Sequence, residues 1–334
     1  MEVIITPTDQ KGFIHYVDGN KLIRSYKGKI FLSENNGIEY SLIIDLSKSF
    51  IDNMMLCNSK IRRLFRFYIY HIIPFHDQLI IFGLKRIFVI CLKEYRLLRE
   101  LPLSGSRPLI VCNDNFGVYY GEYFSNKDRK PVCLFRYTIE TGRFDKFYEF
   151  KNIRHIHGVF HDPYTGKIFL TTGDDDHESF IGYIDNNEII KYVSGNQQSR
   201  VVVLLFDIKY IYYATDAPFE KNFIYRINRH TGVAEKLQEI GGTVFYGATS
   251  SSGIIFSTVV DTNKNLRQDN VELWYSYDGT GWEIVQQFRK DFWPKNLFQH
   301  GHLIISNMQF NSSTLWFTPI AVQGDHVIHK LTTL

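Results

Sequence analysis

The sequence predicts an all-β fold: a β-propeller of four-stranded antiparallel blades, forming a single domain over residues 1–334. Three observations predict it. Aromatic residues make up 16% of the chain, with 27 Phe and 21 Tyr, a composition that favours strands. Short apolar or alternating runs follow one another between Gly, Asn and Asp turns. These runs recur in groups of four with a period of about 45 residues, which is typical of propeller blades.

The clearest repeat unit covers residues 107–150. Its four apolar runs are residues 107–112, 116–123, 132–137 and 144–150. The same pattern begins again at Ile153, Arg200 and Thr243, and weaker versions begin near Arg63 and Leu297. The first 50 residues supply one more unit, so the count favours seven blades. Six blades remain the alternative, because the first unit is irregular. No helical pattern of about 10 or more residues stands out.

The bulk composition excludes several classes of protein. The formal charge is only +3, from 38 basic and 35 acidic side chains, which lacks the basic excess of a nucleic-acid-binding protein. The four cysteines have no metal-binding or redox spacing and are expected to be small buried residues: Cys57, Cys91, Cys112 and Cys133. The start resembles no signal peptide, and no apolar run is long enough for a membrane helix.

These features predict a cytoplasmic protein with no nucleic-acid or membrane partner. Secretion or a periplasmic location becomes the alternative if a leader was removed before residue 1. The oligomeric state is left open.

One predicted turn carries a family signal. Residues 276–282, Ser-Tyr-Asp-Gly-Thr-Gly-Trp, resemble a shortened Asp-box, the S-x-D-x-G-x-T-W hairpin of BNR-repeat, sialidase-like propellers. Residues 137–142 and 228–232 resemble eroded versions that lack the Ser and the Trp. The resemblance covers roughly residues 105–290. Because Asp-boxes are structural turns, it implies the fold and says little about the chemistry.

Charged residues recur at equivalent ends of the predicted strands. In an antiparallel blade, the start of the first strand and the end of the second lie on one face, beside the mouth of the central channel. The first-strand starts carry Arg107, Arg154 and Arg200, and the second-strand ends carry Glu122, Asp174, Asp216 and Asp261. A guanidinium binds a carboxylate through two hydrogen bonds. The arginine trio is similar in type to the sialidase triad that holds a sugar carboxylate. The alternative is that each arginine pairs with the acid of its own blade and so ties neighbouring blades together.

The densest polar segment surrounds His155 and His157. These histidines stand two apart on a predicted first strand, so their side chains face the same side. Together with Asp174 or Glu122 they could exchange protons with a substrate. A second interpretation is a divalent metal site, in which Asp174 or His177 supplies the third ligand. The third is a pair of hydrogen-bonded structural histidines. No other cofactor is predicted.

Tyr246 lies near the start of the first strand of the sixth unit, and is expected to face the channel. The sialidase resemblance implies a tyrosine nucleophile paired with a carboxylate, and some propeller polysaccharide lyases use Tyr or His on uronic acids. Tyr246 is a candidate in either mechanism, and a core tyrosine is the alternative. Asp216, His177 and His300 are further candidates for contact with the substrate.

These patterns together predict a carbohydrate-active protein. Its expected partner is an acidic oligo- or polysaccharide, cleaved at the propeller mouth by glycoside hydrolysis or β-elimination. A metal-dependent lyase is one variant of this hypothesis. The alternative from a different class is a non-catalytic propeller that binds a glycan or a protein, because propellers host many unrelated functions.

Overall fold

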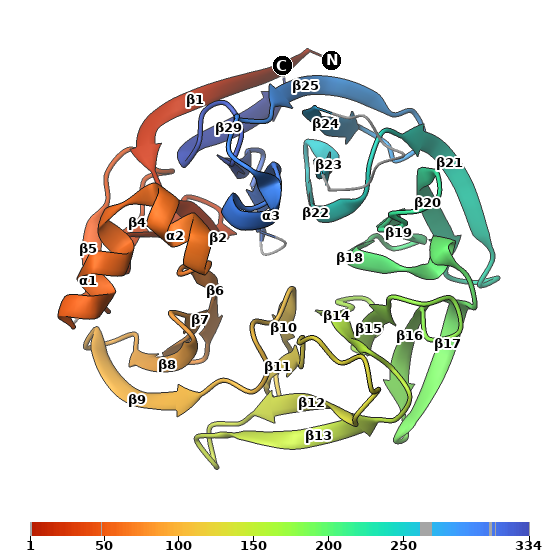
Figure 1. The fold of residues 1–334 in the computed structure, drawn as a ribbon, viewed down its shortest axis with the longest axis horizontal. Coiled ribbons are helices and arrows are strands. Elements are labelled where there is room, and N and C mark those ends of the chain that lie inside the picture. The colour runs from red at the N-terminus through yellow and green to blue at the C-terminus, as the bar shows by residue number, and fades with distance from the viewer. Residues whose placement is uncertain (1, 48, 261–268, 307–308, 311, 334) are drawn as a thin grey trace.

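A computed structural model describes residues 2–47, 49–260, 269–306, 309–310 and 312–333. Seven antiparallel sheets are arranged in a ring around a central channel (Figure 1). This arrangement confirms the predicted propeller and the count of seven blades. In each blade the first strand lies nearest the channel and the last lies at the rim.

The first three blades are consecutive in the chain. Blade 1 consists of β2 (Phe13–Asp18), β3 (Lys21–Tyr26), β4 (Lys29–Ser33) and β5 (Ser41–Asp45), with β27 (Gln309–Phe310) added in parallel to β2. Blade 2 consists of β6 (Ile69–Phe75), β7 (Gln78–Gly83), β8 (Arg86–Cys91) and β9 (Arg96–Pro102). Blade 3 consists of β10 (Val111–Asn113), β11 (Val118–Gly121), β12 (Val132–Tyr137) and β13 (Phe144–Phe150).

The next three blades repeat the same order. Blade 4 consists of β14 (His155–His161), β15 (Ile168–Gly173), β16 (Phe180–Asp185) and β17 (Glu188–Ser194). Blade 5 consists of β18 (Val201–Phe206), β19 (Tyr210–Thr215), β20 (Asn222–Asn228) and β21 (Ala234–Ile240), preceded by the short 3₁₀ helix η1 (Gln197–Ser199). Blade 6 consists of β22 (Val244–Ser250), β23 (Gly253–Thr258), β24 (Asn270–Ser276) and β25 (Glu283–Arg289).

Blade 7 joins the two ends of the chain and closes the ring. It consists of β26 (His302–Ile305), β28 (Leu315–Ile320), β29 (Val327–Thr333) and, at the rim, β1 (Val3–Lys11). The N-terminal strand β1 runs antiparallel to the C-terminal β29, with Val3 opposite Thr333. Both termini therefore lie side by side in Figure 1. The closing hydrogen bonds remove the open edges that a partial ring would leave.

The strands that line the channel share an irregularity. β2, β6, β14, β18 and β22 each carry a β-bulge near the start, against the second strand of the blade. The bulge in β18 falls between Val201 and Leu204, and the bulged residues of the other four strands are His15, Tyr70, His157 and Phe245. A bulge redirects a side chain relative to a regular ladder and is often found beside functional sites. The bulges thus place polar and aromatic side chains around the channel mouth.

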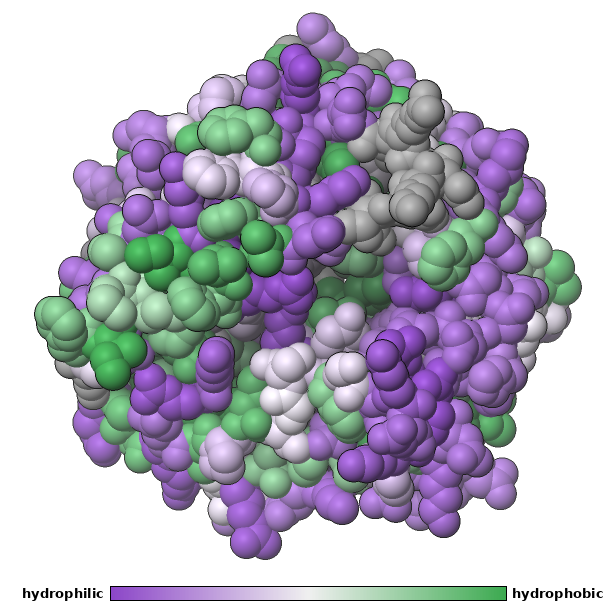
Figure 2. Space-filling view, viewed as in Figure 1, coloured by the Kyte–Doolittle hydropathy of each residue, from purple (hydrophilic) through white to green (hydrophobic). Residues whose placement is uncertain are grey.

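Two short helices between blades 1 and 2 were not expected from the sequence. α1 (Phe50–Cys57) begins at Ser49, which forms a reciprocal capping box with Asp52, and α2 (Ser59–Phe65) follows at once. The one-turn helix α3 (Lys295–Phe298) lies between blades 6 and 7. α1 and α2 lie over the face that points to the viewer in Figure 1, and Figure 2 shows apolar side chains gathered over them. Phe50 and Ile51 are among these exposed residues.

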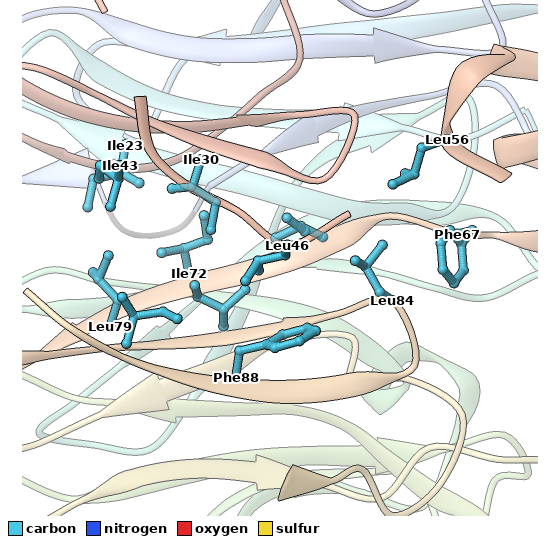
Figure 3. Close-up of a cluster of buried hydrophobic side chains, with 13 residues drawn as sticks. Ile23, Ile30, Ile43, Leu46, Leu56, Phe67, Ile72, Leu79, Leu84 and Phe88 are labelled. Carbon is cyan, nitrogen blue, oxygen red and sulfur yellow. The ribbon is translucent and has the colours of Figure 1, made fainter. Parts of the chain in front are cut away.

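The hydrophobic core is divided among the interfaces between neighbouring blades. Figure 3 shows one cluster, in which side chains of blades 1 and 2 interlock and Leu56 of α1 packs at one end. Ile30, Leu79 and Ile81 in this cluster are completely buried. Each blade covers one face of the next, so the stability of any blade depends on both neighbours.

The cysteines depart in part from expectation. Cys112 and Cys133 are buried, as predicted, but Cys57 is exposed at the end of α1. The reason is that residues 50–57 form a surface helix rather than a core strand. Within the described ranges, no helix has the length and apolar character needed to span a membrane.

The free energy of unfolding should depend on pH through three histidines near the channel: His15, which is buried, and His71 and His302, which are half-buried. Burial lowers the pKa of His15 to about 3, of His71 to about 4 and of His302 to about 3, from an ordinary value of 6.5. These histidines therefore bind protons more readily in the unfolded chain than in the folded protein. Stability is complete above pH 6.5 and is lost as the pH falls from there toward 4, by on the order of 1–2 kcal/mol per histidine at pH 5.

Denaturant titrations at pH 7.5 and pH 5 measure this loss. Replacing His15 by Gln (H15Q) should reduce the difference between the two pH values, because an amide does not titrate. The matched control is H230Q, since His230 is exposed and should leave the difference unchanged. An H15Q protein that loses as much stability as the wild type would contradict the assignment.

Candidate functional site

The candidate site is centred on Asp174, which directly follows the second strand of blade 4. Its carboxylate receives four side chains from two neighbouring blades. Arg154 Nη1 lies 3.1 Å from Oδ2, and Arg200 Nη2 lies 3.0 Å from Oδ1. His155 Nε2 and His157 Nε2 each lie 3.4 Å from Oδ1. The sequence correctly placed these residues on one face, because the antiparallel register brings the start of β14 beside the end of β15.

Gly173, which directly precedes Asp174, leaves room for the Arg200 side chain. Gly173 has a φ of +159°, and a Cβ added there would lie 2.8 Å from Ser179 Oγ and 3.3 Å from Arg200 Cγ. The absence of a side chain at Gly173 therefore allows Arg200 to reach across from blade 5.

The two arginines are tied to acids of the site. Arg154 pairs with Asp174 of its own blade, while Arg200 pairs with Asp174 and also, through Nε at 3.1 Å, with Asp216. This is largely the alternative that the sequence left open, in which arginines bind blade-end acids. Arg200 supplies the tie between neighbouring blades that this alternative includes, because it pairs with Asp174 of blade 4 in addition to Asp216 of its own blade.

The two histidines face each other inside the cluster. Their Nε2 atoms lie 3.1 Å apart, and each Nδ1 lies 3.2 Å from a backbone carbonyl oxygen, that of Phe124 for His155 and of Val201 for His157. Both rings are buried. Burial lowers the pKa of His157 to about 4, although its contact with Asp174 acts in the opposite direction.

The Asp174 carboxyl is strongly acidic. Burial by itself would raise its pKa, but the contacts with His155 and His157 and the charge of Arg200 hold the pKa well below its usual range. Asp174 is thus ionised at every pH at which the protein is expected to be folded. It can accept hydrogen bonds or bind a cation, but it cannot supply a proton at neutral pH.

Arg107 lies apart from this cluster, in the mouth of the central channel. It precedes β10 by several residues instead of starting the strand, so the extended run predicted from residue 107 is wrong in its first part. Its guanidinium lies 5.3 Å from the centre of the Tyr70 ring, and it borders the channel together with His71 and Tyr246. Within the described part of the chain, no carboxylate is paired with Arg107.

A second arginine adds positive charge beside Arg107. Arg66, which ends α2, has its pKa lowered by partial burial and by the charge of Arg107. Tyr246 stacks on His302 with ring centres 5.7 Å apart, and burial raises its pKa while Arg107 lowers it. Figure 2 shows that the molecule is hollowed at the centre of this face.

Tyr123 connects the two groups. Its ring lies 4.2 Å from that of His155, centre to centre, and Arg107 is close enough to lower its pKa against the raising effect of burial. The sequence interpretation missed Tyr123 and Tyr70. Tyr123 could have been found from its position next to Glu122 at the end of a predicted second strand, because this position borders the channel mouth.

Several predicted residues lie outside the site. Glu122 is buried and accepts hydrogen bonds from Ser104 Oγ and from the Cys133 backbone N–H, so it holds blade 3 together. His177 is exposed on the loop after Asp174. His300 lies in the connection to blade 7, where its carbonyl lies 2.8 Å from His302 Nδ1. Asp261 falls outside the described residues.

The turn that resembles an Asp-box lies where the sequence placed it, between the third and fourth strands of blade 6. Asp278 Oδ1 accepts hydrogen bonds from the Thr280 backbone N–H at 2.8 Å and from Thr280 Oγ1 at 2.7 Å. The turn borders a cavity together with Thr249 and Ser250 at the end of the channel strand β22, whereas the candidate site lies where the channel strands begin.

Comparison with known proteins supports the fold and nothing finer. No family model matches the chain, and no curated protein matches it. Among solved structures, a chain of the crystal structure of the mitotic checkpoint complex is similar, with a TM-score of 0.60 and 11% sequence identity. The match covers 99% of this chain and 91% of that one. At this identity the likeness shows a shared propeller architecture alone.

Replacing Asp174 by Asn (D174N) should destabilise the protein by about 2–4 kcal/mol, because two partly buried guanidiniums would lose their shared carboxylate. The measurement is the free energy of unfolding from denaturant titration. D176N is the matched control, since Asp176 is exposed two residues away and accepts one hydrogen bond, from Gln197. If D174N were as stable as the control, Asp174 would not be what joins these arginines.

Proposed function

We propose that this propeller binds a carboxylate-bearing glycan at the channel mouth and cleaves it by β-elimination. The observation that carries the proposal is Arg107: a guanidinium that borders the channel, has no carboxylate partner among the described residues, and has Arg66 close by. Two neighbouring positive charges that have no carboxylate partner in the described part of the chain favour an anionic ligand, and a guanidinium fits a carboxylate in two parallel hydrogen bonds.

The aromatic surroundings of Arg107 suit a sugar. Three tyrosines surround the Arg107 guanidinium and raise its pKa: Tyr70, Tyr123 and Tyr246. Aromatic rings offer apolar surface for the C–H face of a sugar ring, and their hydroxyls can bond to sugar hydroxyls. Arg154 and Arg200 are occupied by acids, so Arg107 and Arg66 are the arginines that would receive the carboxylate.

Elimination needs three things from the protein. The uronate charge must be neutralised, a base must remove the proton on the carbon next to the carboxylate, and the leaving oxygen must receive a proton. The C–H electron pair then forms the new C=C bond as the C–O bond to the neighbouring sugar breaks. Arg107 would neutralise the charge. Tyr246 would remove this proton as a phenolate, whose charge Arg107 stabilises, and would then return the proton from its phenol to the leaving oxygen. Tyr70 is the poorer candidate, because its hydroxyl donates to the Arg66 carbonyl.

Elimination is better supported than hydrolysis. A glycosidase needs a carboxylic acid that keeps its proton until it protonates the leaving group. Asp174, the acid at the centre of the cluster, has its pKa held well below the usual range. Glu122 is engaged by Ser104 and Cys133 within blade 3. The resemblance to sialidase-like propellers, which implies hydrolysis, thus gains no support from these acids.

The test is incubation of the purified protein with a panel of uronate-containing polysaccharides and sialosides. Elimination produces an unsaturated sugar that absorbs ultraviolet light, whereas hydrolysis produces only new reducing ends. We expect ultraviolet-absorbing product from at least one uronate polymer. Y246F should lower kcat by at least about 100-fold with a smaller effect on binding. R107A should abolish both binding and turnover.

The controls are Y277F and R143A, which change an exposed tyrosine and an exposed arginine and should retain full activity. New reducing ends without ultraviolet absorbance would replace elimination by hydrolysis. Glycan binding that depends on Arg107, without turnover of any substrate, would indicate a recognition propeller instead.

A further inference from the structure

The atoms at the centre of the site have the spacing of metal ligands. His155 Nε2, His157 Nε2 and Asp174 Oδ1 form a triangle with sides of 3.1, 3.4 and 3.4 Å. In a tetrahedral zinc site with bonds of 2.0–2.1 Å, two ligand atoms lie about 3.3–3.4 Å apart. The triangle therefore has the dimensions of one face of a zinc tetrahedron.

The hydrogen bonds of the two histidines point to the same conclusion. A backbone carbonyl can only accept, so Nδ1 of each ring carries the proton that it donates to Phe124 or Val201. Each neutral ring then directs an Nε2 lone pair at the other ring and at the carboxylate. Metal-binding histidines are often held in the same way: Nδ1–H donates a hydrogen bond to a backbone carbonyl, and Nε2 is left free to bind the metal.

Three electron-rich atoms at such short distances repel one another unless a positive charge lies between them. A single proton on one Nε2 can serve only one of the contacts at a time. A divalent cation placed between the three atoms would satisfy all of them at once. Two nitrogens and one carboxylate oxygen are a donor set suited to Zn²⁺.

We propose that His155, His157 and Asp174 bind one Zn²⁺ ion, with the fourth position open to water or an anionic ligand. Arg154 and Arg200 would act as positioning residues, because both form ion pairs with the Asp174 carboxylate. The two arginines and the acids Asp174 and Asp216 balance in charge. A bound Zn²⁺ would thus leave the site positive, which favours hydroxide or a carboxylate as the fourth ligand.

The site is independent of the proposed lyase activity. Metal binding is measured without a glycan, so a chain that binds zinc but cleaves nothing would refute only the proposed function. A chain that cleaves uronates but binds no Zn²⁺ would refute only the metal site.

The test is titration of tag-free, chelator-treated protein with Zn²⁺ by calorimetry, followed by Co²⁺ substitution. We expect one equivalent of Zn²⁺ to bind, and Co²⁺ to give the intense visible bands of four-coordinate cobalt without thiolate charge-transfer bands. The wild-type cobalt spectrum needs no variant, so it tests the geometry even if substitutions impair folding. The absence of thiolate bands separates this site from metal held by exposed Cys57.

H155A and H157A should each weaken Zn²⁺ binding by at least about 100-fold, with folding checked by circular dichroism. H177A is the matched control, because His177 is exposed on the adjacent loop and should bind Zn²⁺ as the wild type does. Absence of a one-equivalent site in the wild type would overturn the proposal. So would a six-coordinate cobalt spectrum, or Zn²⁺ affinity that is unchanged in folded H157A.

Discussion

The Asp174 carboxylate is the point on which the candidate site depends. It follows the second strand of blade 4, and it is held by Arg154 and the two histidines from the first strand of that blade and by Arg200 at the start of blade 5. A partly buried carboxylate in contact with two guanidiniums is stable only if all the partners stay in place, because a buried charge without its partner is costly. The acid thus fixes the side-chain positions of the cluster and joins two blades.

The propeller explains why such a cluster can form at the channel mouth. Each blade presents its first strand to the channel, and the ring is closed by the pairing of β1 with β29. The bulges in five first strands turn side chains away from the regular ladder, including His157 in the cluster and Tyr70 beside Arg107. A rigid ring therefore carries two chemically different groups on one face. One is a cluster in which Arg154 and Arg200 pair with Asp174 and Asp216. The other is the Arg107 guanidinium in the channel, which pairs with no carboxylate among the described residues.

The fold could be predicted from the sequence because each blade repeats the same burial pattern. In blade 3 the predicted runs 132–137 and 144–150 coincide with β12 and β13. The helices α1 and α2 escaped prediction for a physical reason. Phe50, Ile51 and Met54 are exposed, so the segment lacks the single buried apolar stripe by which a surface helix is recognised.

The site could be predicted only as far as strand register determines it. Arg154, His155, His157 and Asp174 lie at one end of the paired strands β14 and β15, and the antiparallel register brings them together. Arg200 reaches Asp174 from the start of blade 5, so the packing of neighbouring blades places it there. Arg107 and Tyr123 lie in connections, whose paths follow from packing rather than from register. For the same reason the sequence grouped Arg107 with Arg154 and Arg200, whereas the fold separates it from them.

The most direct measurement of the central claim is anomalous X-ray diffraction at the zinc absorption edge, from crystals of the chain grown with Zn²⁺ and a uronate oligosaccharide. The account predicts one strong anomalous peak between His155 Nε2, His157 Nε2 and Asp174 Oδ1, about 2.0–2.2 Å from each atom, with the sugar carboxylate on Arg107. No peak at this position, with the oligosaccharide bound away from the channel mouth, would contradict it.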